Sequence, residues 1–207
     1  MKTENRALFQ WLKLAGFVAV VGLVYFGFNY LGPEAITNAV HPPSNIEAIR
    51  LGTHAPDFSV PAELIASNKK FHLHQLKGYP VIVHFWATWC GPCLQELPEI
   101  LKLSDQLRPQ GYSFVAVAID QDWAVIEEFF LRNPTLGSIR DRMILVLDPD
   151  SKIANSFGSS RFPETFLINR EMVIDNKFIG AQPWSDPRML PYLENLRGSA
   201  NRSEESK

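Results

Sequence analysis

Two cysteines, Cys90 and Cys93, are the only cysteines in this chain of 207 residues, and they form a Cys-Gly-Pro-Cys sequence. A disulfide framework would need more cysteines at wider spacing, and a structural zinc site usually needs a second pair of ligands. Two thiols three positions apart can form a disulfide with each other and exchange it with another molecule. The pair therefore predicts thiol–disulfide exchange.

The residues around the pair predict how it is held. Residues 81–86 form a nearly continuous apolar run, typical of a strand buried on both faces, and residues 92–107 carry apolar residues at helical spacing. A cysteine at the start of a helix lies near unpaired backbone N–H groups and the positive end of the helix dipole, which both favour the thiolate. We therefore expect Cys90 to be the attacking sulfur and Cys93 to resolve the mixed disulfide. Pro92 fits the first helical turn, where its missing N–H costs nothing.

Strands and helices alternate along the rest of the chain. We expect strands at residues 71–76, 112–119 and 143–147, a hairpin of residues 165–168 and 173–179, and helices at residues 123–133, 151–157 and 185–196. Strand–helix–strand alternation gives a parallel core, and the closing hairpin adds antiparallel strands. The pattern therefore predicts an α/β sandwich.

Several segments resemble a known family. Residues 85–93, Phe-Trp-Ala-Thr-Trp-Cys-Gly-Pro-Cys, are similar to the thioredoxin active site. Glu96, Pro98 and the segments 52–58 and 162–168 resemble its extracytoplasmic branch, the membrane-anchored TlpA/ResA/CcmG (DsbE-like) proteins. The resemblance implies a thioredoxin-like three-layer sandwich, with a mixed central sheet flanked by helices. It also implies an enzyme, a protein-disulfide reductase that works with its own thiols and without a cofactor or metal.

The resemblance also implies roles for individual residues. Cys90 is the nucleophile and Cys93 the resolving thiol. Pro163 forms a cis peptide bond with Phe162 and faces the disulfide, which leaves the Phe162 backbone open to an extended substrate peptide. Glu96 lies near the cysteines and tunes their protonation.

The residues next to the cysteines are expected to contact substrates. These are Trp89, Gly91 and Pro92, together with Phe162 across the site. Trp86 is expected to pack in the core, and Trp89 to cover the sulfurs. The Gly91-Pro92 dipeptide resembles that of reducing thioredoxins, so we expect a reductant rather than an oxidant.

His84 departs from the thioredoxin pattern, because thioredoxin carries a buried acid six positions before its first cysteine. The functional interpretation is a proton acceptor for Cys93, since imidazole titrates near neutral pH. The alternative is a buried, neutral, hydrogen-bonded histidine without a catalytic part. We expect Glu96 to influence the titration of the cysteines more than His84 does.

Three further histidines raise the question of a metal. His72 and His74 alternate on the expected strand 71–76 and would point to the same face, with His54 as a third ligand. The alternative function is an anchored copper-delivery module using Cys90, Cys93 and a histidine. Copper-delivering relatives of this fold usually space their cysteines more widely, so we interpret the three histidines as solvated or structural.

The N-terminal residues predict a membrane anchor. Residues 1–13 carry Lys2, Arg6 and Lys13 against Glu4, whereas residues 14–33 carry no charge. At about 1.5 Å per residue this segment spans about 30 Å, the thickness of the bilayer core. A cleaved signal peptide is the alternative, but its apolar region would be shorter and no clear cleavage site follows. The basic residues keep the N-terminus in the cytoplasm.

The remaining boundaries follow from this anchor. Residues 34–50 form a linker, residues 51–197 the thioredoxin-like domain and residues 198–207 a disordered tail. The protein would then be a single-pass protein of the cell inner (cytoplasmic) membrane. Its catalytic domain would lie in the periplasm or outside the cell. In that oxidising compartment it would need a membrane electron donor for re-reduction.

The net charge of the chain and its family resemblance limit the kinds of molecule that it is expected to bind. The net charge of −2 gives no basic surface for nucleic acid. The expected substrates are disulfide-containing proteins. Residues 163–166 resemble proteins of cytochrome c maturation, which favours apocytochrome c, and general reduction of periplasmic thiols is the alternative.

Overall fold

The computed structural model describes residues 11, 13, 15–23, 25, 26, 51–67, 69–136 and 139–198. The chain divides into two compact units, Met1–Ile46 and Glu47–Lys207. The described residues of the first unit are helical. Within the described part of the chain, no helix is both long and apolar enough to cross a membrane. Much of the predicted span 14–33 lies outside the described residues, as do the predicted linker 34–50 and the predicted tail from residue 199 on.

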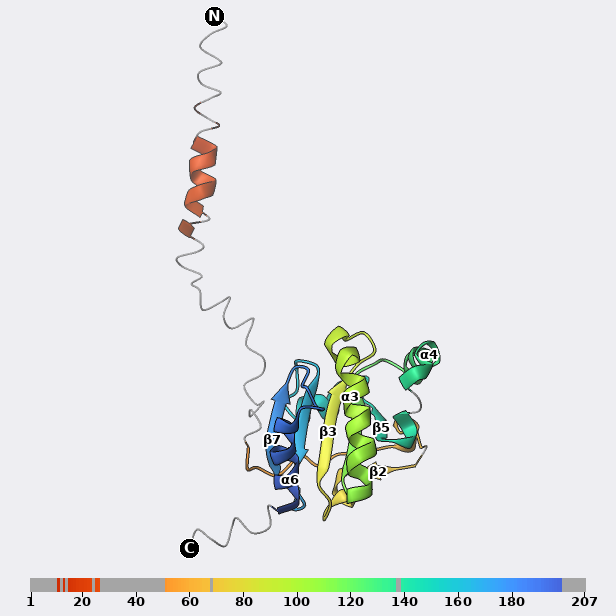
Figure 1. Ribbon diagram of the computed structural model, residues 1–207. Coiled ribbons are helices and arrows are strands. Elements are labelled where there is room, and N and C mark those ends of the chain that lie inside the picture. Colours follow the sequence, from red (N-terminus) through yellow and green to blue (C-terminus); the bar gives the residue numbers. More distant parts are fainter. Residues whose placement is uncertain are drawn as a thin grey trace, which may run out of the picture. The chain divides into compact units, whose positions relative to one another are not determined.

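A five-stranded sheet lies at the centre of the second unit, in the order β5-β4-β3-β6-β7 (Figure 1). The strands are β3 (Val81–Trp86), β4 (Ser113–Ala118), β5 (Ile144–Leu147), β6 (Glu164–Ile168) and β7 (Ile174–Ile179). Strand β3 pairs in parallel with β4, and β4 with β5, whereas β6 is antiparallel to both β3 and β7. The predicted parallel core with an antiparallel hairpin is therefore confirmed.

Helices cover both faces of this sheet. They are α3 (Gly91–Leu107), α4 (Trp123–Arg132), α5 (Lys152–Ser156) and α6 (Leu190–Gly198), with 3₁₀ turns η3 (Arg108–Gln110), η4 (Pro134–Leu136), η5 (Ile139–Asp141) and η6 (Pro187–Met189). Side chains of α3, α4 and α6 pack into one buried cluster on one face, and those of α5 join a second cluster on the other face. The layers are those of the expected thioredoxin-like sandwich. Helix α6 begins later than expected, because residues 187–189 form the turn η6.

A small two-stranded sheet precedes β3. It pairs β1 (Ser59–Val60) with β2 (Phe71–His72), and the turns η1 (Ala62–Leu64) and η2 (Leu73–Leu76) follow them. The sequence pattern did not predict β1.

The predicted strand 71–76 is wrong beyond His72. The chain turns into η2 there because two side chains, one nearby in the sequence and one 17 residues away, accept backbone hydrogen bonds. Asp57 Oδ1 accepts from the N–H of His74 at 3.3 Å, and Gln75 Oε1 accepts from that of His72 at 3.5 Å. His72 and His74 therefore do not share one face of a strand.

Candidate active site

Cys90 and Cys93 form a disulfide at the N-terminus of α3, with their Cα atoms 5.3 Å apart. Cys90 is the N-cap residue, its Sγ accepts a hydrogen bond from the Cys93 N–H at 3.3 Å, and Pro92 lies in the first turn. The predicted placement of the pair at a helix start is confirmed. Cys90 is 6% exposed and Cys93 is fully buried. Cys90 is therefore the sulfur that an attacking group from solvent meets first.

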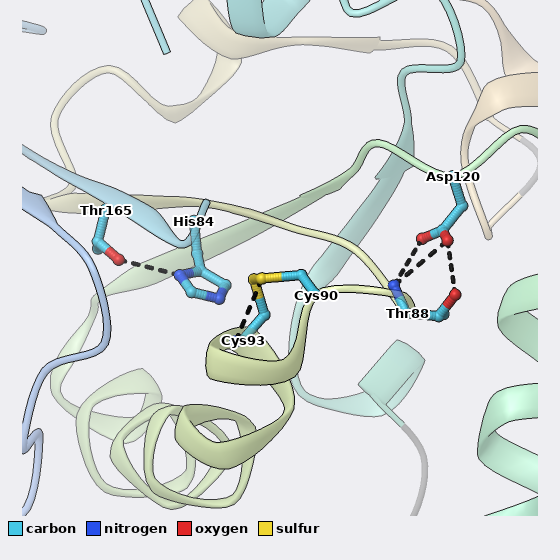
Figure 2. Close-up of a disulfide and its surroundings, with 6 residues drawn as sticks. All are labelled: His84, Thr88, Cys90, Cys93, Asp120 and Thr165. Carbon is cyan, nitrogen blue, oxygen red and sulfur yellow. Dashed lines mark hydrogen bonds between the residues drawn. A yellow bond between two sulfur atoms is a disulfide. The ribbon is translucent and has the colours of Figure 1, made fainter. Parts of the chain in front are cut away.

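A buried carboxylate fixes the loop before Cys90. Asp120 follows β4, and its two oxygens accept hydrogen bonds from the Thr88 N–H at 3.2 and 3.1 Å. The Thr88 hydroxyl also donates to Asp120 Oδ1 at 2.6 Å (Figure 2). These bonds join the ends of two neighbouring parallel strands. No motif in the sequence predicted these bonds, although parallel strands do bring their carboxyl ends to one edge of a sheet.

The peptide bond between Phe162 and Pro163 is cis, as predicted. The Phe162 ring lies against Trp89, with ring centroids 6.3 Å apart in an edge-to-face arrangement. Trp89 is 65% exposed, and Gly91 and Pro92 are exposed as well. Three of the four residues expected to bind substrate, Trp89, Gly91 and Pro92, are thus exposed beside the disulfide. The fourth, Phe162, packs against Trp89. Their role in binding stays a prediction.

His84 lies on β3 and is buried. Its cross-strand neighbour on β6 is Thr165, whose Oγ1 lies 2.9 Å from His84 Nδ1. The other ring nitrogen, Nε2, has no hydrogen-bond partner among the described residues. Burial lowers the pKa of His84 from its usual 6.5 to about 3, so the ring is neutral at physiological pH. Figure 2 shows the imidazole between Thr165 and the disulfide.

Glu96 lies on α3, three residues after Cys93, and it is 3% exposed. The indole N–H of Trp184 donates to its Oε1, and the backbone of Gln182 provides a second hydrogen bond. Its Oε2 has no hydrogen-bond partner in the described part of the chain. Burial raises the pKa of Glu96 to about 7 and outweighs the opposing effect of the two hydrogen bonds, while Glu99 raises it further.

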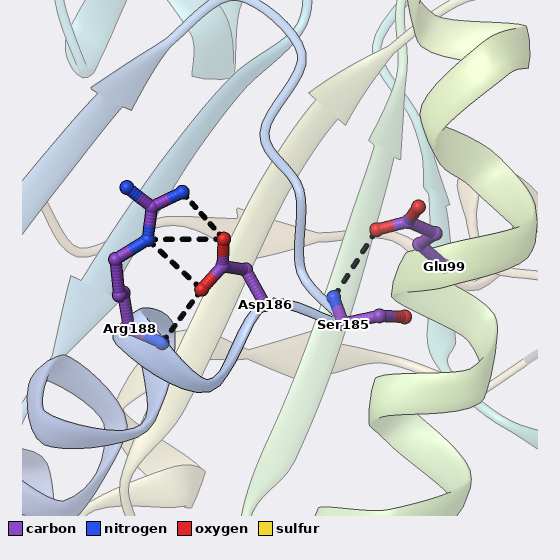
Figure 3. A network of polar contacts seen from close by, with 4 residues as sticks. All are labelled: Glu99, Ser185, Asp186 and Arg188. Atoms are coloured by element: carbon purple, nitrogen blue, oxygen red, sulfur yellow. Dashed lines mark hydrogen bonds and ion pairs between the residues drawn. The ribbon is translucent and has the colours of Figure 1, made fainter.

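The segment from Gln182 to Arg188 connects β7 to α6 and is held against α3. Besides the contacts of Glu96, the Glu99 carboxylate accepts a hydrogen bond from the Ser185 N–H at 3.1 Å (Figure 3). Within the segment, Asp186 pairs with Arg188 at 2.6 Å and accepts from its backbone N–H at 2.9 Å. Trp184 could not be predicted from the sequence as the partner of Glu96, because it lies 88 residues further along the chain.

Among the described residues, His54, His72 and His74 do not assemble a metal site. His74 Nδ1 lies 3.1 Å from Asp57 Oδ1, and both side chains are more than half exposed. Within the described ranges, no three or more His, Cys, Asp or Glu side chains form a group that could hold a metal ion. The copper-delivery alternative therefore has no convergent ligand set in this part of the chain.

Comparison with known proteins agrees with this geometry. The Redoxin family model matches residues 50–195. The thiol-disulfide oxidoreductase ResA of Bacillus anthracis is 27% identical over 194 residues, which cover 93% of this chain and 98% of that protein. ResA of Bacillus subtilis (strain 168) is 27% identical over 171 residues, 83% of each chain.

Solved structures share the fold. A thiol:disulfide interchange protein from Chlorobium tepidum TLS superposes with a TM-score of 0.57 at 24% identity, covering 72% of this chain and 98% of that one. StoA from Bacillus subtilis gives a TM-score of 0.53 at 23% identity, covering 67% and 97%. With the family model spanning well over half of the sequence and a Cys90–Cys93 disulfide at the helix start, this chain belongs to the Redoxin family and is a thiol–disulfide oxidoreductase similar to the ResA proteins.

Proposed function

We propose that this protein is a membrane-anchored, extracytoplasmic reductase that reduces disulfides in partner proteins, with apocytochrome c as a substrate. The observation that carries the direction of the reaction is the buried carboxyl of Glu96, three residues beyond Cys93. With its pKa raised to about 7, this group is partly ionised at neutral pH.

A negative charge near the cysteines opposes their ionisation. The helix N-terminus favours the Cys90 thiolate, which stabilises the dithiol form and makes a pair oxidising. The Glu96 carboxylate acts in the opposite direction, because like charges repel, and so makes the pair more reducing. The reducing function depends on this balance.

The surface around Cys90 supports a protein substrate. Trp89 projects an exposed indole next to Phe162, and the cis peptide bond at Pro163 precedes strand β6. An extended segment containing a disulfide can lie against these aromatic rings while its sulfur meets Cys90. The heme-attachment Cys-x-x-Cys of apocytochrome c, when its two cysteines are oxidised to a disulfide, is a segment of this kind.

The extracytoplasmic location is proposed from the charge pattern of residues 1–33, with basic residues before an uncharged segment. In an oxidising compartment a reductase needs a supply of electrons, so we propose a membrane donor that re-reduces the Cys90–Cys93 disulfide. Thiol labelling of intact spheroplasts tests the location. Labelling of reduced Cys90 from outside supports it, and a soluble mature form beginning near Val40 contradicts the anchor.

The direction is tested by equilibrating the protein with glutathione buffers. We expect a potential towards ~−270 mV, in the range of thioredoxin, whereas a value near ~−120 mV would show an oxidant. Glu96→Gln should make the potential less negative, because it removes the charge that opposes the thiolate. Glu99→Gln, which removes a carboxylate further along the same helix, is the matched control and should shift the potential less.

The substrate is tested by trapping. In cells carrying Cys93→Ala, the mixed disulfide between Cys90 and its substrate cannot be resolved and accumulates. We expect apocytochrome c among the trapped proteins. The double variant Cys90→Ala/Cys93→Ala is the control, and a trapped set without apocytochrome c would contradict this substrate.

A further inference from the structure

Trp184 joins the segment between β7 and α6 to helix α3. Its side chain is 3% exposed, and its indole N–H donates a hydrogen bond to Glu96 Oε1. The ring of Phe178 on β7 packs against the indole in an edge-to-face arrangement, with ring centroids 5.5 Å apart. The indole is therefore held between β7 and α3, with its N–H on the carboxyl group of Glu96.

The same segment contacts α3 at two further places. The backbone of Gln182 provides another hydrogen bond to Glu96, and the Ser185 N–H donates to the Glu99 carboxylate at 3.1 Å (Figure 3). Glu96 and Glu99 are three residues apart and therefore lie on one side of the helix. Three donors from this segment thus contact two carboxyl groups in the helix that Cys90 caps.

Few charges act on the Glu96 carboxyl among the described residues. Glu99 raises its pKa by like-charge repulsion, and burial raises it more. Asp186 and Arg188, at the end of the segment, pair with each other at 2.6 Å. On the facing sheet, His84 is neutral, because burial lowers its pKa to about 3. The hydrogen bonds from Trp184 and the Gln182 backbone are therefore what favours the ionised form of Glu96 in the described structure.

We propose that Trp184 is a positioning residue for disulfide exchange: its indole N–H stabilises the Glu96 carboxylate, whose charge limits the ionisation of the Cys90 thiol in the reduced protein. A hydrogen bond to a charged acceptor is stronger than one to a neutral acceptor, so the indole favours the carboxylate over the acid. The inference rests on the proposed function for the effect of Glu96 on the cysteines, and it adds the residue that controls the charge of Glu96.

An uncharged donor has a different effect from a cation at this place. A lysine or arginine would also hold Glu96 ionised, but its positive charge would offset the repulsion between the carboxylate and a thiolate. The indole stabilises the carboxylate and adds no charge. The negative charge of Glu96 therefore acts on the cysteines without a compensating cation.

The first measurement is the titration of Glu96 in the full-length protein with its disulfide closed. Carboxyl-¹³C glutamate makes Glu96 visible by NMR, and Glu96→Gln identifies its resonance. Trp184→Phe keeps a ring against Phe178 but removes the donor, so the pKa of Glu96 should rise by about 1, the effect of one hydrogen bond to a charged group. Trp123→Phe, which removes an indole donor to the Glu63 carbonyl at 2.7 Å, is the matched control and should leave this pKa unchanged.

The second measurement is the rate at which iodoacetamide alkylates Cys90 in the reduced protein. In Trp184→Phe the neutral fraction of Glu96 at pH 8 should rise from about one tenth to about one half, so alkylation at this pH should become up to about fivefold faster. At pH 5, where Glu96 is protonated in both proteins, the two rates should agree. A general loosening of the fold would not confine the change to this range of pH.

A double variant tests whether Trp184 acts through Glu96. Glu96→Gln alone should also speed the alkylation of Cys90 at pH 8, because it removes the charge. Adding Trp184→Phe to Glu96→Gln should then change the rate no further, since the group on which the indole acts is gone.

Two results would overturn the proposal. One is a pKa of Glu96 that is the same in Trp184→Phe as in the unchanged protein. The other is an effect of Trp184→Phe on alkylation that is as large in the Glu96→Gln background as in the wild type. The proposed function fails in a different way. If Glu96→Gln left the alkylation of Cys90 unchanged, the charge of Glu96 would not act on the thiols, which would also end the effect of Trp184 on Cys90. An oxidising potential would contradict only the proposed direction.

Discussion

The two faces of the central sheet are packed in different ways. On the face towards α5, aromatic rings interlock: Phe157 lies 5.4 Å from Phe85 and 5.1 Å from Phe166, measured between ring centroids. Two buried acidic groups on this side have partners: Glu164 has an ion pair with Lys177 at 3.2 Å, and Asp148 accepts hydrogen bonds from the N–H groups of Ile153 and Ala154 in α5. The Lys177 ammonium also lies 4.9 Å from the Phe166 ring.

The face towards α3 combines apolar packing with buried polar groups. His84 Nε2, Trp86 Nε1 and Glu96 Oε2 all lack a hydrogen-bond partner among the residues described. The same face carries the disulfide. Two further buried atoms, Ser159 Oγ and Glu164 Oε2, also make no hydrogen bond, although Glu164 Oε2 has its ion pair with Lys177. The face towards α3 therefore differs in holding three such atoms on the side of the disulfide, at a cost in stability.

The largest effect is expected from His84→Asn, as a change in how stability depends on pH. Below pH 6.5 the unfolded chain protonates His84, whereas the folded protein does so only near pH 3. The contribution of His84 to stability therefore becomes less favourable as the pH falls through this window, by up to about 5 kcal/mol. His84→Asn should lack this loss, as measured by urea unfolding at a series of pH values. An unchanged pH dependence would mean that His84 is solvated or paired.

A substitution on the face towards α5 should change the stability of the fold and leave disulfide exchange unchanged. Phe157→Ala removes a fully buried ring that contacts three other phenylalanines, and we expect a loss of about 4 kcal/mol in the free energy of unfolding. The rate of disulfide exchange per folded molecule should stay within twofold of the wild type. A large loss of exchange in the folded variant would show that the two faces are not separate in function.

Glu96→Gln should act on stability with the sign opposite to that of His84→Asn. Above pH 4.5 the unfolded chain loses the Glu96 proton, whereas the folded protein keeps it until about pH 7. The contribution of Glu96 to stability therefore becomes less favourable as the pH rises through this window, by about 3 kcal/mol, and the glutamine variant lacks this change. Urea unfolding at pH 4 and pH 8 measures the difference, and a parallel pH profile of the two proteins would contradict the raised pKa.

These two windows overlap between pH 4.5 and 6.5, where the contributions of His84 and Glu96 have equal and opposite slopes. Together they cancel in the wild-type protein. Each single variant should therefore reveal the slope of the group that remains, which the wild-type profile hides.

The smallest effect is expected from Lys177→Met. The change leaves Glu164 buried on the face towards α5 without the ion-pair partner that it has in the wild type. Because the Lys177 side chain is 21% exposed, water can replace part of the interaction, and we expect a loss of about 2 kcal/mol in chemical unfolding. The double variant Glu164→Gln/Lys177→Met should regain part of it. If the loss in the free energy of unfolding were as large as that from Phe157→Ala, the ion pair would contribute as much to stability on this face as the aromatic packing does.

The elements with strong periodicity could be predicted from the sequence. The apolar run 81–86 coincides with β3, and the helix expected at residues 92–107 begins at Gly91. The cis peptide at Pro163 also followed from the resemblance of its segment. In each case the signal lies within a few consecutive residues, either as a hydrophobic period or as a motif.

The rest depended on contacts between residues that are distant in the sequence. No pattern near His84 indicates Thr165, which becomes its neighbour only through the pairing of β3 with β6. The contact of Glu96 with Trp184 likewise requires the chain to return over α3. At His74, one hydrogen bond to Asp57 helps convert an expected strand into a 3₁₀ turn. Whether Glu96 or His84 has the larger effect on the cysteine titration stays a prediction.

The closeness of Cys90 and Cys93 in the chain has a consequence for folding. Their disulfide closes a loop with a sequence separation of only 3, so it removes little conformational freedom from the unfolded chain. By the loop-entropy relation this contributes about 2 kcal/mol, less than half of what a bridge across about 100 residues would provide. The sheet and helices must therefore be stable without it. A chain that folds independently of its disulfide can be oxidised and reduced in every catalytic cycle without unfolding.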